Sequence, residues 1–289
     1  MHSSNDIILK DISDLSERSG LISEQKSILI AMLSEQIPQS PSYTDILNLY
    51  LMFCRETDGL SLSDKICFCR AVRKTAGAAF ADALSIIDAD FSVPKGSRGK
   101  TAFVKNLYNE AAYKLFSSAI SQPTPISYSS FEDCCDAVAS DVCEFVILPI
   151  ENSIDGKMFS FYSLLDQYDL RIHSVCNREY ANDAKSIHYT LAGKPNIKHD
   201  ISYANSTSKE IFEFSLSVDT DTNNIDITLA AALCSARIHR ISTLPLSYND
   251  TLRFYYSLAF SVPEQLKTFI TYLCLEYPQY TPIGLYREI

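Results

Sequence analysis

The chain has 289 residues, of which 46% are hydrophobic and 21% are charged, and these values are typical of a globular protein with about two domains. Its formal net charge of −10 argues against a nucleic-acid partner, so an anionic ligand must be held by local positive groups. No apolar run approaches the roughly 20 residues that a membrane helix needs, and the acidic N-terminal stretch is unlike a targeting peptide, so we expect a cytoplasmic protein with no membrane partner.

Residues 1–93 are predicted to form an all-helical N-terminal domain. Apolar residues recur at helical spacing within 28–33, 46–53 and 66–73, and the proline-containing stretch 38–42 separates the first two stripes. The basic side chains of this block are expected to be solvated, because they follow no recognisable active-site pattern. The sequence leaves open whether the domain has an activity of its own.

Nine cysteines are spread along the chain without the paired C-x-x-C spacing of a zinc site. Cys67 and Cys69 are the most suggestive pair, but residues two apart on a helix do not face each other. We therefore expect reduced, mainly structural thiols and no metal site.

A second domain is predicted to begin near residue 94. Residues 94–100 contain two glycines and three basic residues, a composition typical of a linker or first loop. Helical and strand-like segments then alternate at 108–116, 131–139, 144–148, 159–168 and 170–175. This alternation predicts an α/β domain with a largely parallel sheet. His173, on the last of these strands, and His188 are expected to be surface histidines.

The most informative stretch is Pro-Ile-Glu-Asn-Ser-Ile-Asp-Gly at 149–156. It follows the apolar, strand-like run 145–148 and precedes residues 158–168, whose apolar residues recur at helical spacing. A carboxylate, an amide and a hydroxyl therefore lie where a strand ends and a helix begins, a junction at which α/β folds bind ligands. The same residue types are common in loops and caps, so an ordinary loop is the alternative.

This motif, followed by Leu164-Leu165, resembles the signature of prephenate dehydratases. Weaker similarities to the family occur in the same order, so that the resemblance spans residues 97–254; they lie at 130–133, 136–138, 187–191, 230–236 and 244–254. The resemblance implies that residues 94–254 form a two-lobed domain like the type 2 periplasmic binding proteins, with the active site between the lobes. In bifunctional relatives, a chorismate mutase helical bundle occupies the position of residues 1–93.

The resemblance also implies a reaction and a set of residues. The enzyme would be a lyase that converts prephenate, a small anionic substrate, to phenylpyruvate in phenylalanine biosynthesis. It needs a hydrogen-bond donor at the leaving hydroxyl and fixed groups for two carboxylates. The implied catalytic residues are Thr251, as the donor, with Asn152 and Ser153, which orient the substrate. The implied substrate-binding residues are Glu151, which anchors the loop, Gly156, Arg253 and Phe254. Neither a metal nor an organic cofactor is implied.

Two departures from the family pattern leave an alternative open. Leu252 is inserted between Thr251 and Arg253, so Thr251 and Phe254 keep their family positions only if the strand bulges. The glycine-rich start of the family is reduced at 96–103. The alternative is an inactive relative that binds an aromatic acid or a partner and acts as a regulator. The sequence does not distinguish prephenate from arogenate, its amino-acid analogue.

Residues 255–289 resemble the beginning of a regulatory ACT domain. Strand-like, helical and strand-like stretches at 253–260, 264–276 and 280–286 give a βαβ order, about half of such a domain. Half a sheet would leave an exposed edge, so we expect a homodimer that covers it. The family's phenylalanine-binding element is not matched at 263–266, which leaves regulation by phenylalanine open.

Overall fold

The computed structural model describes residues 4–38, 41–84, 99–120, 122–154, 156–180, 185–195, 210–218, 223–245 and 252–289. Thr251 therefore lies outside the described residues. The chain divides into two compact units. The first comprises Met1–Ser85 with Lys267–Tyr277, and the second comprises Ile86–Leu266 with Pro278–Ile289.

The first unit is helical. Its elements are α1 (Ser4–Ser34), α2 (Tyr43–Glu56), α3 (Leu62–Leu84) and most of α8 (Pro263–Glu276). Helix α2 begins with a capping box, in which Ser42 and Asp45 bond each other's backbone N–H groups. The rings of Phe53 and Phe68 stack at 5.0 Å in the core between α2 and α3. None of the helices in the described parts of the chain is long and apolar enough to cross a membrane.

Contacts with α2 and α3 fix the end of α8 in this unit. The Tyr43 hydroxyl donates to the Cys274 carbonyl at 2.8 Å, and Lys65 Nζ pairs with Glu276 Oε2 at 2.9 Å. The Tyr50 hydroxyl donates to the same carboxylate. Residues 267–277 thus belong to the first unit, whereas the rest of the predicted segment 255–289 belongs to the second. The sequence does not reveal this, because the contacts join residues 211 to 231 positions apart.

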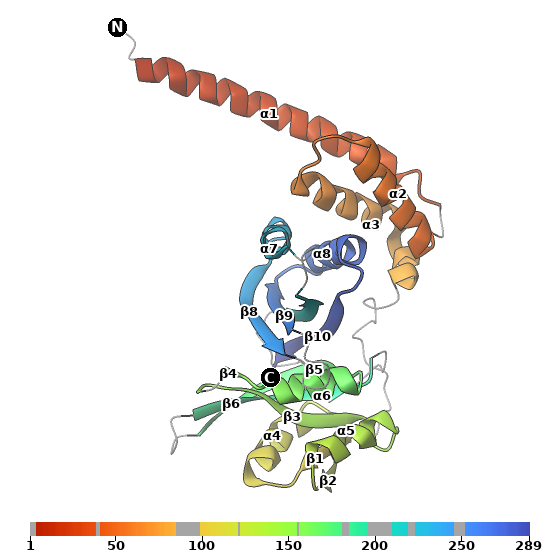
Figure 1. The fold of residues 1–289 in the computed structure, drawn as a ribbon, viewed down its shortest axis with the longest axis vertical. Coiled ribbons are helices and arrows are strands. Elements are labelled where there is room, and N and C mark those ends of the chain that lie inside the picture. The colour runs from red at the N-terminus through yellow and green to blue at the C-terminus, as the bar shows by residue number, and fades with distance from the viewer. Residues whose placement is uncertain are drawn as a thin grey trace. The chain divides into compact units, whose positions relative to one another are not determined.

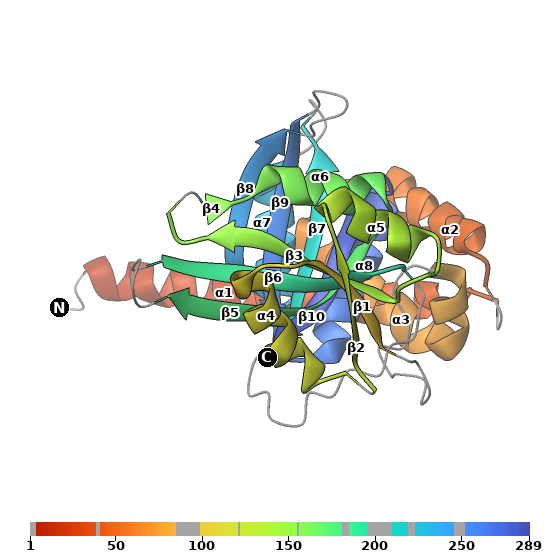
Figure 2. The ribbon, with the colours of Figure 1, turned by 90° about the horizontal axis from the view of Figure 1, so that it is seen from below.

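The second unit is built on one ten-stranded sheet, in the order β2-β1-β3-β6-β5-β10-β7-β9-β8, with β4 paired to β3. Figure 2 shows β3, β6 and β5 lying in succession. The strands are β1 (Lys100–Val104), β2 (Thr124–Tyr128), β3 (Phe145–Asn152), β4 (Gly156–Lys157), β5 (Arg171–Tyr180), β6 (Lys185–Gly193), β7 (Glu210–Ser217), β8 (Arg237–Pro245), β9 (Leu252–Phe260) and β10 (Thr281–Glu288). The helices are α4 (Leu107–Ser117), α5 (Phe131–Ala139), α6 (Phe159–Gln167) and α7 (Asn224–Leu233).

Strand β3 is buried on both faces, which explains its continuous apolar sequence. Val146 and Leu148 belong to a core cluster with residues of α5 and α6, whereas Phe145 and Ile147 belong to a separate cluster with residues of α4. Figure 1 shows α4, α5 and α6 beside these strands. Helices on both faces of the sheet are the α/β architecture that the alternating segments predicted.

The sheet is mixed rather than largely parallel as predicted. Pairs β1–β2, β1–β3 and β5–β10 are parallel, whereas β3–β6, β5–β6, β7–β10, β7–β9 and β8–β9 are antiparallel. Strand β6 inserts between β3 and β5 in the antiparallel direction. Alternating helix and strand signals fix the element types, but they do not reveal such an insertion.

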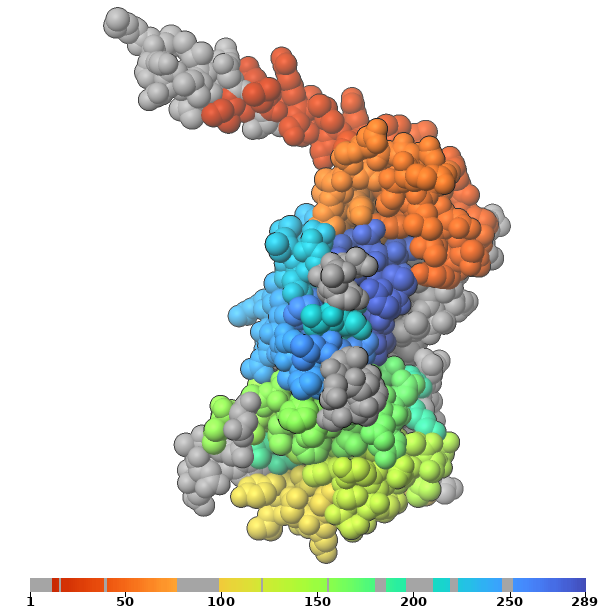
Figure 3. All heavy atoms as spheres, viewed as in Figure 1, coloured from red at the N-terminus to blue at the C-terminus, as the bar shows by residue number. Residues whose placement is uncertain are grey.

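The sequence predicted that residues 255–289 form only half of a small sheet. In the structure, β7 and β8 pair with the strands of this segment and supply the other half. Elements β7, α7, β8, β9, α8 and β10 follow in the order βαββαβ, and their strands are arranged β10-β7-β9-β8, a split βαββαβ topology. Strand β9 lies between β7 and β8, so the expected open edge beside it is covered by the same chain. That edge therefore gives no reason for a homodimer. Strand β8 forms the sheet edge and is largely exposed, as Figure 3 shows in light blue.

Candidate functional site

The Pro-Ile-Glu-Asn-Ser motif forms the end of β3 and its hairpin with β4, and not the start of a helix. Strand β3 continues to Asn152 beyond the apolar run 145–148, and pairs with β4 in antiparallel register. Gly156 adopts a φ of +76°, a left-handed conformation that glycine takes without strain. Helix α6 begins only at Phe159. The free N–H groups of a helix start, expected next to the motif, are therefore replaced by a hairpin.

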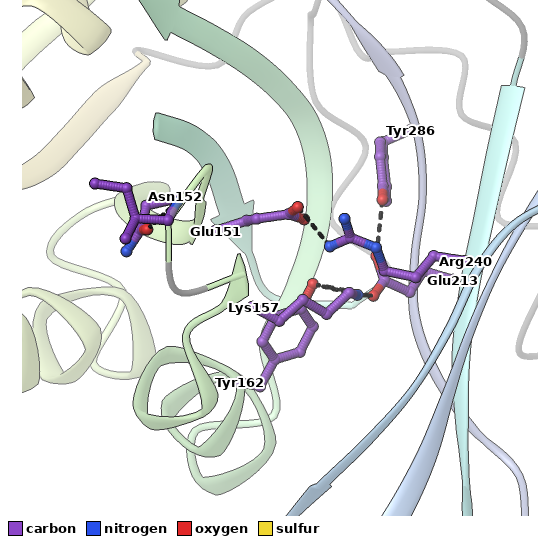
Figure 4. Close-up of polar contacts among 8 residues, drawn as sticks. Glu151, Asn152, Lys157, Tyr162, Glu213, Arg240 and Tyr286 are labelled. Carbon is purple, nitrogen blue, oxygen red and sulfur yellow. Dashed lines mark hydrogen bonds and ion pairs between the residues drawn. The ribbon is translucent and has the colours of Figure 1, made fainter. Parts of the chain in front are cut away.

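Alternation along β3 separates the motif's side chains. Glu151 and Ser153 line a cavity, whereas Asn152 is buried and points away from Glu151 and its partners (Figure 4). Asn152 Oδ1 accepts the N–H of Ile154 at 2.9 Å. Ser153 Oγ accepts the N–H of Ser186 at 3.0 Å. Asn152 thus shapes the hairpin, while Ser153 lies on the cavity wall.

The cavity has a volume of about 350 Å³, at the lower end of the roughly 300–1,000 Å³ typical of small-molecule sites. It lies where the two halves of the sheet meet, because its walls come from β3–β6 on one side and from β7–β10 on the other. Its apolar wall includes Ile150, Val175 and Ile211. Its polar wall includes Glu151, Ser153, Lys157, His188, Glu213 and Arg240. A small ligand with an apolar ring and charged groups fits this lining.

A buried ion pair between β4 and β7 forms one end of the site. Lys157 Nζ pairs with Glu213 Oε1, and the two side chains are only 6% and 1% exposed. The hydroxyls of Tyr162 and Tyr286 donate to the same carboxylate at 3.0 Å and 2.7 Å (Figure 4). Lys157 also lies 4.4 Å from the centre of the Tyr162 ring. Each charge of this pair is therefore held by several partners, as a buried charge requires.

The two tyrosines of this network are held in their neutral form. Burial, followed by the charge of Glu213, raises the pKa of Tyr162 well above its usual value. The same causes raise the pKa of Tyr286. Both hydroxyls therefore keep their protons at neutral pH and act as hydrogen-bond donors.

A second ion pair joins the motif to the edge strand. Glu151 Oε1 pairs with Nη1 of Arg240, which projects from β8 (Figure 4). The Glu151 side chain is 20% exposed and that of Arg240 is 41% exposed, so solvent reaches both. The ion pair thus connects Glu151 of the motif to another strand of the sheet.

Arg253 and Phe254, which the resemblance implies as substrate-binding residues, do not lie on the wall of this cavity. Arg253 pairs with Asp166 at 3.3 Å and donates to Thr281 Oγ1 at 2.9 Å. Phe254 lies beside Tyr256, with ring centres 6.3 Å apart. Neither Arg253 nor Phe254 lines the cavity, and Thr251 lies outside the described residues. Of the six implied residues that the structure describes, Glu151 and Ser153 line this cavity.

Sequence reasoning missed Glu213, Arg240 and Tyr286, and left Lys157 without a role. No short motif surrounds the first three, and the partners in the Lys157–Glu213 pair are 56 positions apart. His188 also lines the cavity, although a surface position was expected. Burial lowers the pKa of His173, the other expected surface histidine, to about 4. Within the described residues, no three His, Cys, Asp or Glu side chains are grouped as metal ligands.

These features define an α/β domain with a large mixed sheet and a partly polar cavity. Its fold is similar to that of a solved prephenate dehydratase from Streptococcus mutans, with a TM-score of 0.54 and 14% identity over 65% of this chain and 98% of that one. Also similar are a quorum-quenching acylase, GqqA (TM-score 0.49, 15% identity, 66% and 96% covered), and the prephenate dehydratase of Arthrobacter aurescens in complex with L-Phe (TM-score 0.48, 11% identity, 65% and 90% covered). No curated protein sequence matches the chain significantly.

Residues 106–213 match the family model described as prephenate dehydratase. This region contains the motif at 149–156, together with β3, β4 and the start of β7. This stretch, a little over a third of the chain, is a divergent prephenate dehydratase domain. The resemblance inferred from the motif is thereby confirmed.

Proposed function

We propose that the chain is a prephenate dehydratase, a cytoplasmic lyase that acts in phenylalanine biosynthesis. One observation carries the proposal: Glu151 and Ser153 of the family motif lie on the wall of a cavity that also offers Arg240 and His188. The apolar wall suits the six-membered ring of the substrate, and the charged wall suits its carboxylates. The family match over 106–213 supports the same reaction.

The reaction breaks two bonds of prephenate. The electron pair of the ring carbon–carboxylate bond enters the ring as CO2 leaves, and the ring hydroxyl departs as hydroxide, which needs a proton to become water. A donor at that hydroxyl lowers the barrier, and fixed groups must hold the two carboxylates in position. The reaction requires neither a metal nor an organic cofactor, because the aromatic ring that forms drives both steps.

Ser153 fits the role of the donor, and Arg240 is a cation for one of the two carboxylates. A hydroxyl has one donor and two acceptor positions, so Ser153 accepts the Ser186 N–H and still has its own O–H to donate. Arg240 is a permanent cation on the same cavity. Asn152 and Arg253 do not line this cavity, and Thr251 lies outside the described residues, so the three are secondary targets for substitution.

A second candidate function is a non-catalytic protein that binds an aromatic acid and regulates a partner. The charge balance of the cavity favours it. Lys157 and Arg240, the two permanent cations of the wall, are each paired with a carboxylate of the chain, and Glu288 adds a third carboxylate. A substrate with two negative charges must therefore compete with groups that the cavity already holds.

The test is the conversion of prephenate to phenylpyruvate by the purified full chain. Ser153→Ala should lower kcat by about 100-fold or more, the range of an effective proton donor. Ser27→Ala, which removes an exposed hydroxyl from α1, should leave turnover unchanged. If the wild-type chain binds prephenate but converts it no faster than the uncatalysed reaction, the dehydratase proposal fails and the regulatory candidate replaces it.

A further inference from the structure

The two ion pairs of the cavity differ in how easily a ligand can replace them. Lys157 and Glu213 are almost completely buried, and Glu213 is also bonded by two tyrosine hydroxyls. Removing the carboxylate would leave the buried lysine and two tyrosine hydroxyls without their acceptor, and removing the lysine would leave a buried carboxylate without a cation. Glu151 and Arg240 are partly exposed and lie on opposite sides of the cavity wall, on β3 and β8. A charged ligand therefore meets one exchangeable pair, that of Glu151 and Arg240.

The chemistry of this pair selects the ligand's head group. A carboxylate that binds Arg240 takes the place of Glu151, and Glu151 then needs a new cation. A keto acid supplies none, and its keto oxygen would face the released carboxylate. An α-amino acid supplies an ammonium group on the carbon next to its carboxylate, so both charges of the pair keep an opposite partner.

We propose that the Glu151–Arg240 pair recognises an α-amino acid head group, with the carboxylate at Arg240 and the ammonium at Glu151. The inference rests on the proposed function, because it takes this cavity as the substrate site. It assigns the substrate class: a six-membered ring that bears an amino-acid side chain, as in the amino-acid analogue of prephenate, is preferred to the keto acid. Ile150, Val175 and Ile211 form the apolar wall against which the ring packs.

Two charge counts support this assignment. The wall carries the carboxylates of Glu151, Glu213 and Glu288 against the permanent cations of Lys157 and Arg240. Carboxylates therefore outnumber permanent cations in the lining, and the whole chain has a formal net charge of −10. Each ammonium group added to a ligand reduces its repulsion from such a lining.

The first experiment compares three probes by calorimetric titration of the full chain: L-phenylalanine, 3-phenylpropionate, which lacks the ammonium, and phenylpyruvate, which has a keto group instead. L-phenylalanine should bind at least 10-fold more tightly than either acid. Equal affinity for all three, or tighter binding of the two acids, would overturn the inference. This comparison uses the wild-type chain and therefore does not depend on whether a variant folds.

Substitutions then test whether Glu151 binds the ammonium group and Arg240 binds the carboxylate. Glu151→Gln should remove the preference for the ammonium, so that L-phenylalanine and 3-phenylpropionate bind within about 2-fold of each other. Arg240→Gln should weaken both by about 10-fold or more, and Arg240→Lys should recover part of that loss. Arg237→Gln, an exposed arginine of the same strand outside the cavity, is the matched control. A preference that survives Glu151→Gln would show that L-phenylalanine is recognised elsewhere and would refute the assignment.

Turnover separates this inference from the proposed function. A kcat/KM for prephenate that exceeds the value for its amino-acid analogue by 10-fold would overturn the inference and leave the dehydratase proposal standing. Binding of L-phenylalanine through Glu151 and Arg240, without turnover of either substrate, would support the inference and overturn the dehydratase proposal.

Discussion

Breaking the buried pair of Lys157 and Glu213 should strongly destabilise the second unit. Substituting Lys157 with Met removes a charge that is 6% exposed and leaves Glu213, which is 1% exposed, with two tyrosine donors and no cation. Breaking a buried ion pair in this way costs about 3–5 kcal/mol of unfolding free energy. Because the two tyrosines still satisfy the carboxylate, we expect the lower end, about 3 kcal/mol.

Glu213→Leu should cost more than Lys157→Met. It leaves the lysine charge and both tyrosine hydroxyls without their acceptor, and each unsatisfied hydroxyl adds about 1–3 kcal/mol. In the double variant the unpaired charges disappear together, so its loss should be at least about 2 kcal/mol smaller than the sum of the single losses. Urea unfolding of the full chain, followed by circular dichroism, measures all three.

Lys194→Met is the matched control for this cycle. Lys194 pairs with Asp141 at 2.7 Å, but the two side chains are 28% and 75% exposed, and an exposed pair contributes at most about 1 kcal/mol. If Lys157→Met also costs less than about 1 kcal/mol, or if the losses in the cycle add without coupling, the buried pair does not stabilise the fold and the reasoning is refuted.

Two further predictions concern the second unit. Burial lowers the pKa of His173 to about 4, below its value of about 6.5 in an unfolded chain, so its contribution of roughly 3 kcal/mol is complete above pH 6.5 and is lost as the pH falls toward 4. His173→Gln should flatten the unfolding free energy across that range, and an unchanged slope would contradict the burial. Gly284→Ala should destabilise the chain by about 1–3 kcal/mol, because its Cβ would lie 2.7 Å from Ile172 Cβ and against the Ile172 carbonyl. Gly20→Ala, which meets no atom within 4 Å in the exposed helix α1, should instead be neutral or stabilising in the same melts.

Much of the second unit could be predicted from local sequence. The apolar run 145–148 forms the core of β3, and the helices expected at 108–116, 131–139 and 159–168 are α4, α5 and α6. The motif at 149–156 led to the family that the match over 106–213 confirms. These features depend on periodicity and on residues close together in the chain, so the sequence contains what is needed to identify them.

The sheet order and the composition of the cavity were decided by tertiary structure. Nothing local indicates that β6 inserts between β3 and β5, or that β7 and β8 cover the expected open edge of β9. Arg253 is the arginine that the family resemblance implies, yet it pairs with Asp166. Arg240, on the edge strand, is the arginine that pairs with Glu151. The sequence alone determined the motif and the family, because both are read from neighbouring residues. The side on which each motif residue points, and the charge that it meets there, depended on strand register and on strands brought together from distant parts of the chain.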